Sequence, residues 1–291
     1  MPTLPNPTKA IASEELRSCR SGDWATPDDF RFEDNHNAIF IHGFTGHGSN
    51  MKTLFDYLSK FGFNVFIFNY KSSRGIERAA VALHSILDEL NRHDSVIECR
   101  KVSFVCHSMG GLVARAFTFH PEACRFINKI VTLGTPHNGA FRGDKWLNTA
   151  VKAARVICKV PLTGYTAKKV VAAEELLGTD HESAPLIHRL LSQNYDTETI
   201  PILSISGGSQ SLHGMPLVGA LCNMRLQKMI NSNPNDGLVP ETSSSLSSDI
   251  YAQCLPLRDH WNQYPEFDQT NHFNFSDMQK IGLHISNWLR S

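Results

Sequence analysis

One serine in the middle of the chain stands where a nucleophile would be expected. The run from Val102 to Gly111, VSFVCHSMGG, passes from apolar, strand-like residues into His-Ser-Met-Gly-Gly. A sharp strand-to-helix turn of this kind exposes a serine hydroxyl at the end of a sheet. Such a turn is strained, so the residues two before and two after the serine must be small. Gly110 meets this requirement, and Cys106 stands where the common pattern has glycine. We therefore interpret Ser108 as a candidate nucleophile.

Two backbone N–H groups are placed to complete the chemistry of an acyl transfer. This reaction needs donors aimed at the developing oxyanion, one after the nucleophile and one in the loop after an early strand. Met109 and Phe44 occupy these places, and Phe44 belongs to the glycine-rich run HGFTG from His42 to Gly46. A third run, TLGTPHNG from Thr132 to Gly139, would border the pocket for the acyl group.

The elements that must position these residues alternate between strand and helix. Apolar spacing of three and four predicts a helix from Arg74 to His93, and another is expected near 112–119. The final helix is expected from Phe275 to Leu289. The apolar runs predict strands at 37–42, 64–70, 101–105, 126–133 and 200–206, with a weaker one at 251–257. This order predicts an α/β protein with a mostly parallel sheet and helices on both faces.

Composition removes several classes of partner and cofactor. Lys plus Arg and Asp plus Glu both number 28, so the long-range field of a nucleic-acid binder is absent. The first 34 residues contain no apolar signal core, and no stretch is long enough to span a membrane, which favours a cytoplasmic protein, although non-classical export stays open. The seven cysteines show no CxxC spacing, and no metal site is predicted.

Together, the HGFTG, CHSMGG and TLGTPHNG segments resemble the lipase and esterase branch of the α/β-hydrolases. That branch carries an HGF or HGxxG loop, an HSMGG elbow and a TLGTPHxG loop in this order, and the resemblance extends from about Asn37 to the C-terminus. It implies an α/β-hydrolase domain over 35–291 after a polar lead-in over 1–34. The lapse in strand–helix rhythm at about 141–196 is then interpreted as an inserted helical cap.

The resemblance also implies where the other two members of a catalytic triad lie, because the branch has the chain order Ser, acid, His. The acid is Asp236 in the turn NDGLVP, and the base is His272 in NHFNF, just ahead of the final helix. His260, in RDHW, follows the acid in the same order and remains the alternative base. We favour His272 because its loop leads directly into the closing helix.

The resulting expectation is a serine hydrolase that cleaves carboxylic esters through a covalent acyl-enzyme and needs no cofactor. Some lipases of this branch bind calcium through an Asp two residues after the base; that position is Asn274 here, so the metal is not carried over. The expected partner is a small-molecule acyl ester or lipid, with transient contact to a lipid surface left open. The alternatives are a thioesterase or acyltransferase of the same fold and a catalytically silent module that binds an acyl ligand.

Overall fold

The structure of the protein is a computed structural model. It describes residues 14–19, 22–30, 36–44, 51–92, 100–120, 122–139, 175–176, 185–192, 200–206, 239, 241–244 and 279–291. Ser108, Phe44 and Met109 lie within these ranges. The predicted acid Asp236, both candidate bases, the weak strand at 251–257 and most of the predicted cap lie outside them.

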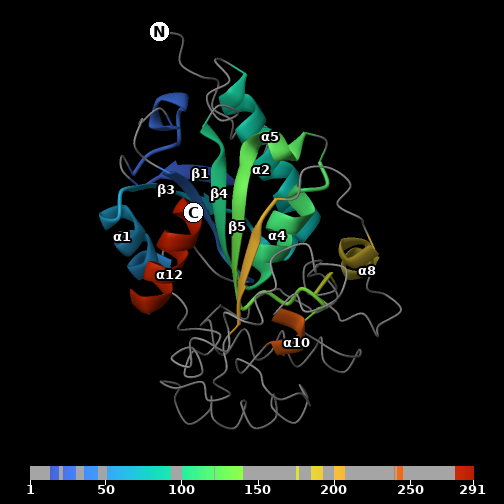
Figure 1. The fold of residues 1–291 in the computed structure, drawn as a ribbon. Helices are drawn as coiled ribbons and strands as arrows, with labels where there is room; N and C mark the ends of the chain where they lie inside the picture. The colour runs from blue at the N-terminus through green and yellow to red at the C-terminus, as the bar shows by residue number, and fades with distance from the viewer. Residues whose placement is uncertain are drawn as a thin grey trace, which may run out of the picture.

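A twisted sheet with helices on both sides forms the centre of the molecule (Figure 1). Within the described residues it has six strands in the order β1-β3-β2-β4-β5-β6. Every neighbouring pair is parallel except β1 and β3. The strands are β1 (Glu15–Ser18), β2 (His36–Ile41), β3 (Phe63–Asn69), β4 (Val102–His107), β5 (Ile127–Leu133) and β6 (Ile202–Ile205). The mostly parallel α/β sheet predicted from the sequence is confirmed, whereas β1 was not predicted.

Alternation along the central strands divides the interior into two cores. In β2, Ile39 and Ile41 belong to one buried cluster, while Ala38 and Phe40 belong to the other. Successive side chains of a strand point to opposite faces, so a strand that is apolar at every position must be covered on both sides. The near-continuous apolar runs of the sequence therefore require a three-layer arrangement.

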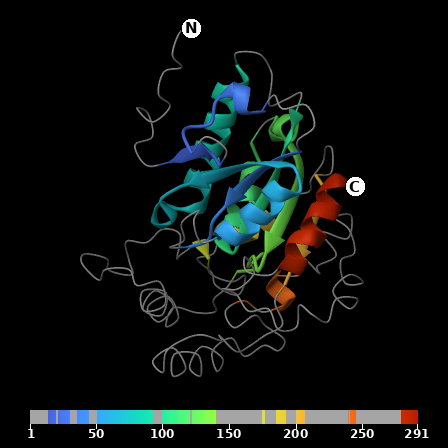
Figure 2. The ribbon, with the colours of Figure 1, turned by 90° about the vertical axis from the view of Figure 1, so that its left-hand side faces the viewer.

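Two longer helices cover each face of the sheet. The first core is closed by α2 (Ile76–Asn91) and α4 (Met109–Phe117), and the second by α1 (Lys52–Lys60) and α12 (Gln279–Arg290). Figure 2 shows the first and last helices of this set, α1 and α12, lying side by side on one face of the sheet. The remaining short elements are two 3-10 turns at Pro27–Phe30 and Ser72–Arg74, and the helices α5 (Ala123–Phe126), α8 (Pro185–Ser192) and α10 (Glu241–Ser244). No helix among the described residues is long and apolar enough to cross a membrane.

Two described pieces of the predicted cap region pack beside α2. Leu176 and Ile187 are buried in the same core as α2 and α4. The Glu175 carboxylate accepts a hydrogen bond from the Ile76 N–H at the start of α2, and a carboxylate there also interacts favourably with the helix dipole. Arg189 of α8 forms an ion pair with Glu77. These contacts anchor the C-terminal part of the 141–196 region to the α2 side of the sheet.

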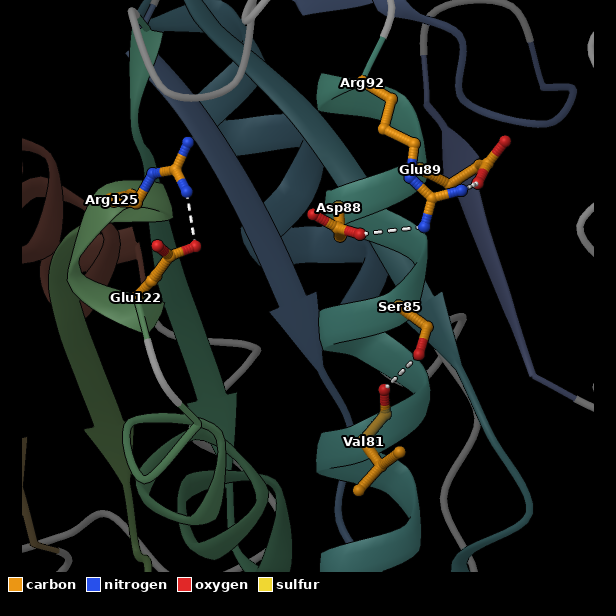
Figure 3. A network of polar contacts seen from close by, with 7 residues as sticks. All are labelled: Val81, Ser85, Asp88, Glu89, Arg92, Glu122 and Arg125. Atoms are coloured by element: carbon orange, nitrogen blue, oxygen red, sulfur yellow. Dashed lines mark hydrogen bonds and ion pairs between the residues drawn. The ribbon is translucent and has the colours of Figure 1, made fainter.

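Charged residues at the ends of α2 and α5 form local ion pairs (Figure 3). Arg92 bonds Asp88 at 3.0 Å and Glu89 at 2.6 Å, and Arg125 pairs with Glu122 on α5. Because such surface pairs are screened by water, they contribute little to stability. This face shows helix-terminal charge pairing rather than a built site.

The last helix is fixed against α1 at a glycine. A Cβ added to Gly282 would lie 2.5 Å from the ring of Tyr57 on α1, so the two helices approach more closely than any side chain at 282 would permit. At the other end of the helix, Lys129 of β5 donates a 2.9 Å hydrogen bond to the Trp288 carbonyl. Ile281 and Ile285 are fully buried beneath this contact. The helix that follows the predicted base loop, α12, is thus held in one defined position against α1 and β5.

We predict that Gly282→Val lowers the free energy of unfolding by about 1 to 3 kcal/mol, the usual cost of overpacking a tight contact. Urea denaturation would measure it, with Leu283→Val at the exposed neighbouring position as the matched control. In a Tyr57→Ala background the same glycine substitution should cost less, since the clashing ring is gone. An equal loss of unfolding free energy in both backgrounds would contradict the close contact between Gly282 and Tyr57.

Candidate active site

The direction of the chain through the sheet reverses between β2 and β4. From β2 the chain moves outward to β3, and from β4 it moves the other way to β5 and β6. In open parallel sheets, ligands bind at the carboxyl ends of the strands where the order reverses. The loop after β2 carries Gly43 and Phe44, and the turn after β4 carries Ser108. The segments singled out in the sequence therefore meet at this switch point.

Ser108 occupies a strained turn between β4 and α4. Its φ of 53° and ψ of −126° lie in a region that residues other than glycine rarely adopt. The surroundings impose this conformation: the Ser108 N–H donates to the Leu133 carbonyl at 2.8 Å, and its carbonyl accepts from the Thr135 hydroxyl at 2.8 Å. Strain of this kind is held only where neighbouring structure fixes it, and such residues cluster at functional sites. The predicted nucleophile elbow is thus present in the backbone.

Two glycines allow the helix after Ser108 to approach its neighbours. A Cβ on Gly110 would lie 2.2 Å from the Ile41 carbonyl oxygen and 2.8 Å from that of His42. A Cβ on Gly111 would lie 2.1 Å from the Thr135 hydroxyl oxygen. The small residue required two positions after the serine is therefore explained by backbone of β2, which cannot move aside.

The loop after β2 touches the candidate nucleophile. A Cβ on Gly43 would lie only 2.8 Å from the Ser108 Cβ and 3.2 Å from the His107 carbonyl oxygen. Phe44 follows directly and packs partly buried against the α2 side of the core. The structure thus brings the loop of one predicted oxyanion donor, Phe44, against Ser108, which Met109 follows directly at the start of α4. The role of their N–H groups remains a prediction.

His42 supports this loop through a contact the sequence did not reveal. Its imidazole stacks on Tyr70 with ring centroids 4.2 Å apart, and the Tyr70 hydroxyl donates to the His42 carbonyl at 2.6 Å. The Tyr70 N–H donates to Nε2 at 3.3 Å, so Nδ1 carries the proton and faces the Gly43 carbonyl at 2.9 Å. His42 therefore orders the loop. Tyr70 ends an apolar run and carried no signal of its own.

The cysteine that replaces the usual glycine of the elbow is buried. Cys106 is 0% exposed, and burial raises the pKa of its thiol well above the ordinary value. A thiol reacts as the thiolate, which an apolar environment disfavours. Cys106 is therefore a packing residue beneath the turn.

The TLGTPHNG loop surrounds a buried histidine. His137 is fully buried, and burial together with the Arg115 guanidinium lowers its pKa well below the ordinary value. Its ring nitrogens face Arg115 Nη1 at 3.3 Å and the Thr132 hydroxyl at 3.2 Å. The sequence gave no indication that a fully buried arginine on α4 contacts this histidine.

The described neighbours of the predicted acid and base lie at two places on this scaffold. After Asp236, Val239 is 1% exposed and α10 lies beyond the carboxyl end of β6 (Figure 1). After His272, the next described element is α12, which begins at Gln279. Asp236, His272 and His260 themselves lie outside the described residues. Among the residues that the structure does describe, no group of three or more His, Cys, Asp or Glu could hold a metal ion.

Comparison with known proteins supports the class of protein that the fold and the turn at Ser108 indicate. The chain has an α/β-hydrolase fold. It superimposes on the mature form of Bacillus licheniformis lipase BlEst2 with a TM-score of 0.52 and 16% identity, covering 89% of this chain and 92% of that one. The propeptide form of the same lipase gives a TM-score of 0.51 and 19% identity over 72% of this chain and 43% of that one.

The sequence itself matches known proteins over shorter stretches. Residues 71–156, which include the elbow and the loop after β5, match the PGAP1-like alpha/beta domain family. A 43-residue stretch is 49% identical to Phospholipase A(1) LCAT3 of Arabidopsis thaliana. That stretch covers 14% of this chain and only 10% of the plant protein. The resemblance to lipase-like α/β-hydrolases is thereby confirmed.

We predict that Gly110→Ala destabilises the fold by at least about 2 kcal/mol, because the new methyl group would overlap two backbone carbonyls. Thermal unfolding would measure the loss. Gly22→Ala is the control: it has a positive φ of 76° but open space around the new atom, so it should cost only about 1 kcal/mol. A Gly110 variant as stable as the Gly22 variant would contradict the close approach.

Proposed function

We propose that this protein is a serine hydrolase that cleaves carboxylic esters through an acyl-enzyme. Ser108 is the nucleophile, His272 the general base and Asp236 the acid that orients it. The N–H groups of Phe44 and Met109 form the oxyanion hole. The ester is a small-molecule acyl ester or a lipid, and the names of the lipase and phospholipase relatives support this substrate class.

One observation carries the proposal: Ser108 holds a positive φ at the strand-order switch, with the loop after β2 in contact with it. A serine without a chemical role would gain nothing from this conformation, which costs about 1 to 3 kcal/mol. Helix α4 begins directly after Ser108, and a helix N-terminus favours negative charge.

The chemistry proceeds in two balanced steps. His272 takes the proton of Ser108 as the hydroxyl oxygen attacks the ester carbonyl, and the resulting oxyanion is stabilised by the two N–H groups. Collapse expels the alcohol, which receives the proton from His272. Water then loses a proton to His272 and attacks the acyl-enzyme, which releases the carboxylic acid and returns the proton to Ser108. Asp236 keeps the imidazole in one tautomer and stabilises its charged form.

We predict that Ser108→Ala lowers kcat for p-nitrophenyl ester hydrolysis by at least about 1,000-fold, because loss of the nucleophile in comparable triads costs several orders of magnitude. Ser85→Ala is the matched control, since that hydroxyl bonds only its own helix on the exposed face of α2 (Figure 3). A fluorophosphonate probe should label the wild type and the control, and should leave Ser108→Ala unlabelled. Activity within tenfold of the wild type would refute the assignment.

A second prediction separates the two candidate bases. His272→Ala should lose nearly as much activity as Ser108→Ala, and the double variant should lose little more, because residues that act as one unit are not additive. His260→Ala should stay within a few fold of the wild type. The same kinetic assay decides between them, and the reverse ranking would make His260 the base.

The chemical class of the substrate follows from a matched set of compounds. Hydrolysis of p-nitrophenyl esters of increasing acyl length measures the depth of the acyl pocket, and an acyl thioester of the preferred length tests the thioesterase alternative. A silent binding module would fail to hydrolyse every compound and to react with the fluorophosphonate.

A further inference from the structure

A fully buried arginine connects the helix of the nucleophile to the loop after β5. Arg115 lies on α4 and is 0% exposed. Its Nη1 donates to the His137 carbonyl at 3.2 Å and lies 3.3 Å from His137 Nδ1, and its Nη2 donates to the Leu190 carbonyl of α8. A buried charge is tolerated only when it is well hydrogen-bonded, so these acceptors fix the position of its side chain.

From His137 the hydrogen bonds continue across two strands. His137 Nε2 is 3.2 Å from the Thr132 hydroxyl of β5, which donates to the Ser204 hydroxyl of β6 at 3.1 Å. The Ser204 hydroxyl donates in turn to the Ser244 carbonyl of α10. We call these five residues, Arg115, His137, Thr132, Ser204 and Ser244, the Arg115–Ser244 chain.

The direction of every bond in this chain is determined by its two ends. The guanidinium can only donate, so His137 Nδ1 must accept and Nε2 must carry the ring proton. Nε2–H then donates to Thr132, and each hydroxyl accepts one bond and donates the next. The series ends at a carbonyl, which can only accept. Neutral His137 in one tautomer is the form that completes the chain, in agreement with the buried position of its ring.

Further bonds attach α10 to the same loop. The Ser243 hydroxyl donates to the Gly139 carbonyl at 2.7 Å and accepts from the Asn138 N–H at 3.1 Å. The His137 N–H donates to the Ser243 carbonyl at 2.9 Å. The two serines of α10 are thus buried and bonded on both sides, although this element is a single helical turn.

We propose that the Arg115–Ser244 chain is a positioning device that sets the acid-bearing turn relative to Ser108. Arg115 belongs to the helix that begins directly after Ser108, and α10 begins five residues after Asp236, with buried Val239 between them. The chain links the segments of nucleophile and acid through the strands β5 and β6. This inference rests on the proposed function, because it assigns the turn with Asp236 a catalytic task. None of the five residues is itself a catalytic residue.

The position of Thr132 allows a matched pair of variants. Thr132→Val keeps the shape of the side chain and removes both hydrogen bonds of the hydroxyl. Thr132→Ser keeps the hydroxyl and removes only a methyl group. If the residue merely packs, the two variants should behave alike or the serine should be worse. If the chain positions the acid, only the valine should impair catalysis.

The kinetic test measures kcat and KM for a p-nitrophenyl ester in both variants. Small displacements of catalytic groups cost up to about 100-fold in rate, so Thr132→Val should lower kcat by at least about tenfold, with KM within about threefold of the wild type. Thr132→Ser should keep kcat within about threefold. The proposal is overturned if folded Thr132→Val keeps wild-type kcat, or if both variants lose kcat equally. Should Thr132→Val not fold, Ser204→Ala removes the hydroxyl that accepts from Thr132 and donates to Ser244, and it carries the same expectation.

A second measurement does not depend on ester hydrolysis. Hydrogen–deuterium exchange of peptides covering 231–244 should be faster in Thr132→Val than in Thr132→Ser, because the series of hydrogen bonds that connects α10 through Ser204 to β5 and His137 is broken at Thr132. Unchanged exchange in the valine variant overturns the positioning device. A wild type that neither hydrolyses esters nor reacts with a fluorophosphonate would refute the proposed function. The exchange result would then show separately whether the Arg115–Ser244 chain holds α10 in place.

Discussion

The architecture of the site depends on one backbone contact, the approach of α4 to the end of β2 at Gly110. The Ile41 carbonyl occupies the space where a Cβ of residue 110 would be. Only a glycine at this position therefore lets the helix begin immediately after Ser108 and cross the switch point at close range. The turn is then too short for an ordinary conformation, and Ser108 takes a positive φ. The same approach brings Gly43 against Ser108, and Cys106 lies fully buried two residues before the turn. The strained turn at Ser108 and the position of the neighbouring loop are thus consequences of a single steric constraint.

The parts of this arrangement that local pattern determines were predictable from the sequence. The strands β2 to β6 are apolar on both faces, so their composition predicts burial in a parallel sheet, and the glycine after Ser108 reports a contact that only glycine permits. Strand β1 was missed because ELRS buries only alternate residues and is held at the edge by pairing with β3. Arg115 was missed for another reason: an arginine on a short helix normally lies in water, and only the distant carbonyls of His137 and Leu190 explain its burial. Asp236 and His272 rest on the order of motifs, since no local pattern brings distant loops together.

The carboxyl end of the sheet combines two kinds of interior. Toward its middle, β5 and β6 carry apolar side chains that pack without preferred direction. Toward the carboxyl ends, Thr132, Ser204 and Ser206 carry hydroxyls instead. Thr132 bonds Ser204, and both Ser204 and Ser206 bond Ser244 of α10. Apolar contacts would hold this segment in several similar arrangements, whereas a completed series of hydrogen bonds has low energy in one. The buried hydrogen bonds next to the candidate catalytic loop therefore fix the position of α10 more accurately than apolar packing alone would.

The antiparallel strand at the edge of the sheet bears on how the protein avoids association with itself. Strand β3 has the sequence FNVFIFN, in which five of seven residues are aromatic or β-branched and none is charged. An uncovered edge of this composition is a template for pairing with other chains. β1 occupies that edge with only four residues and carries the charged side chains of Glu15 and Arg17. The Glu15 carboxylate pairs with Arg17 and accepts a hydrogen bond from the Asn69 side chain. Strand β1, three places from β4 in the strand order, thus keeps other chains from pairing with β3, a role that the motifs around the candidate site give no reason to expect.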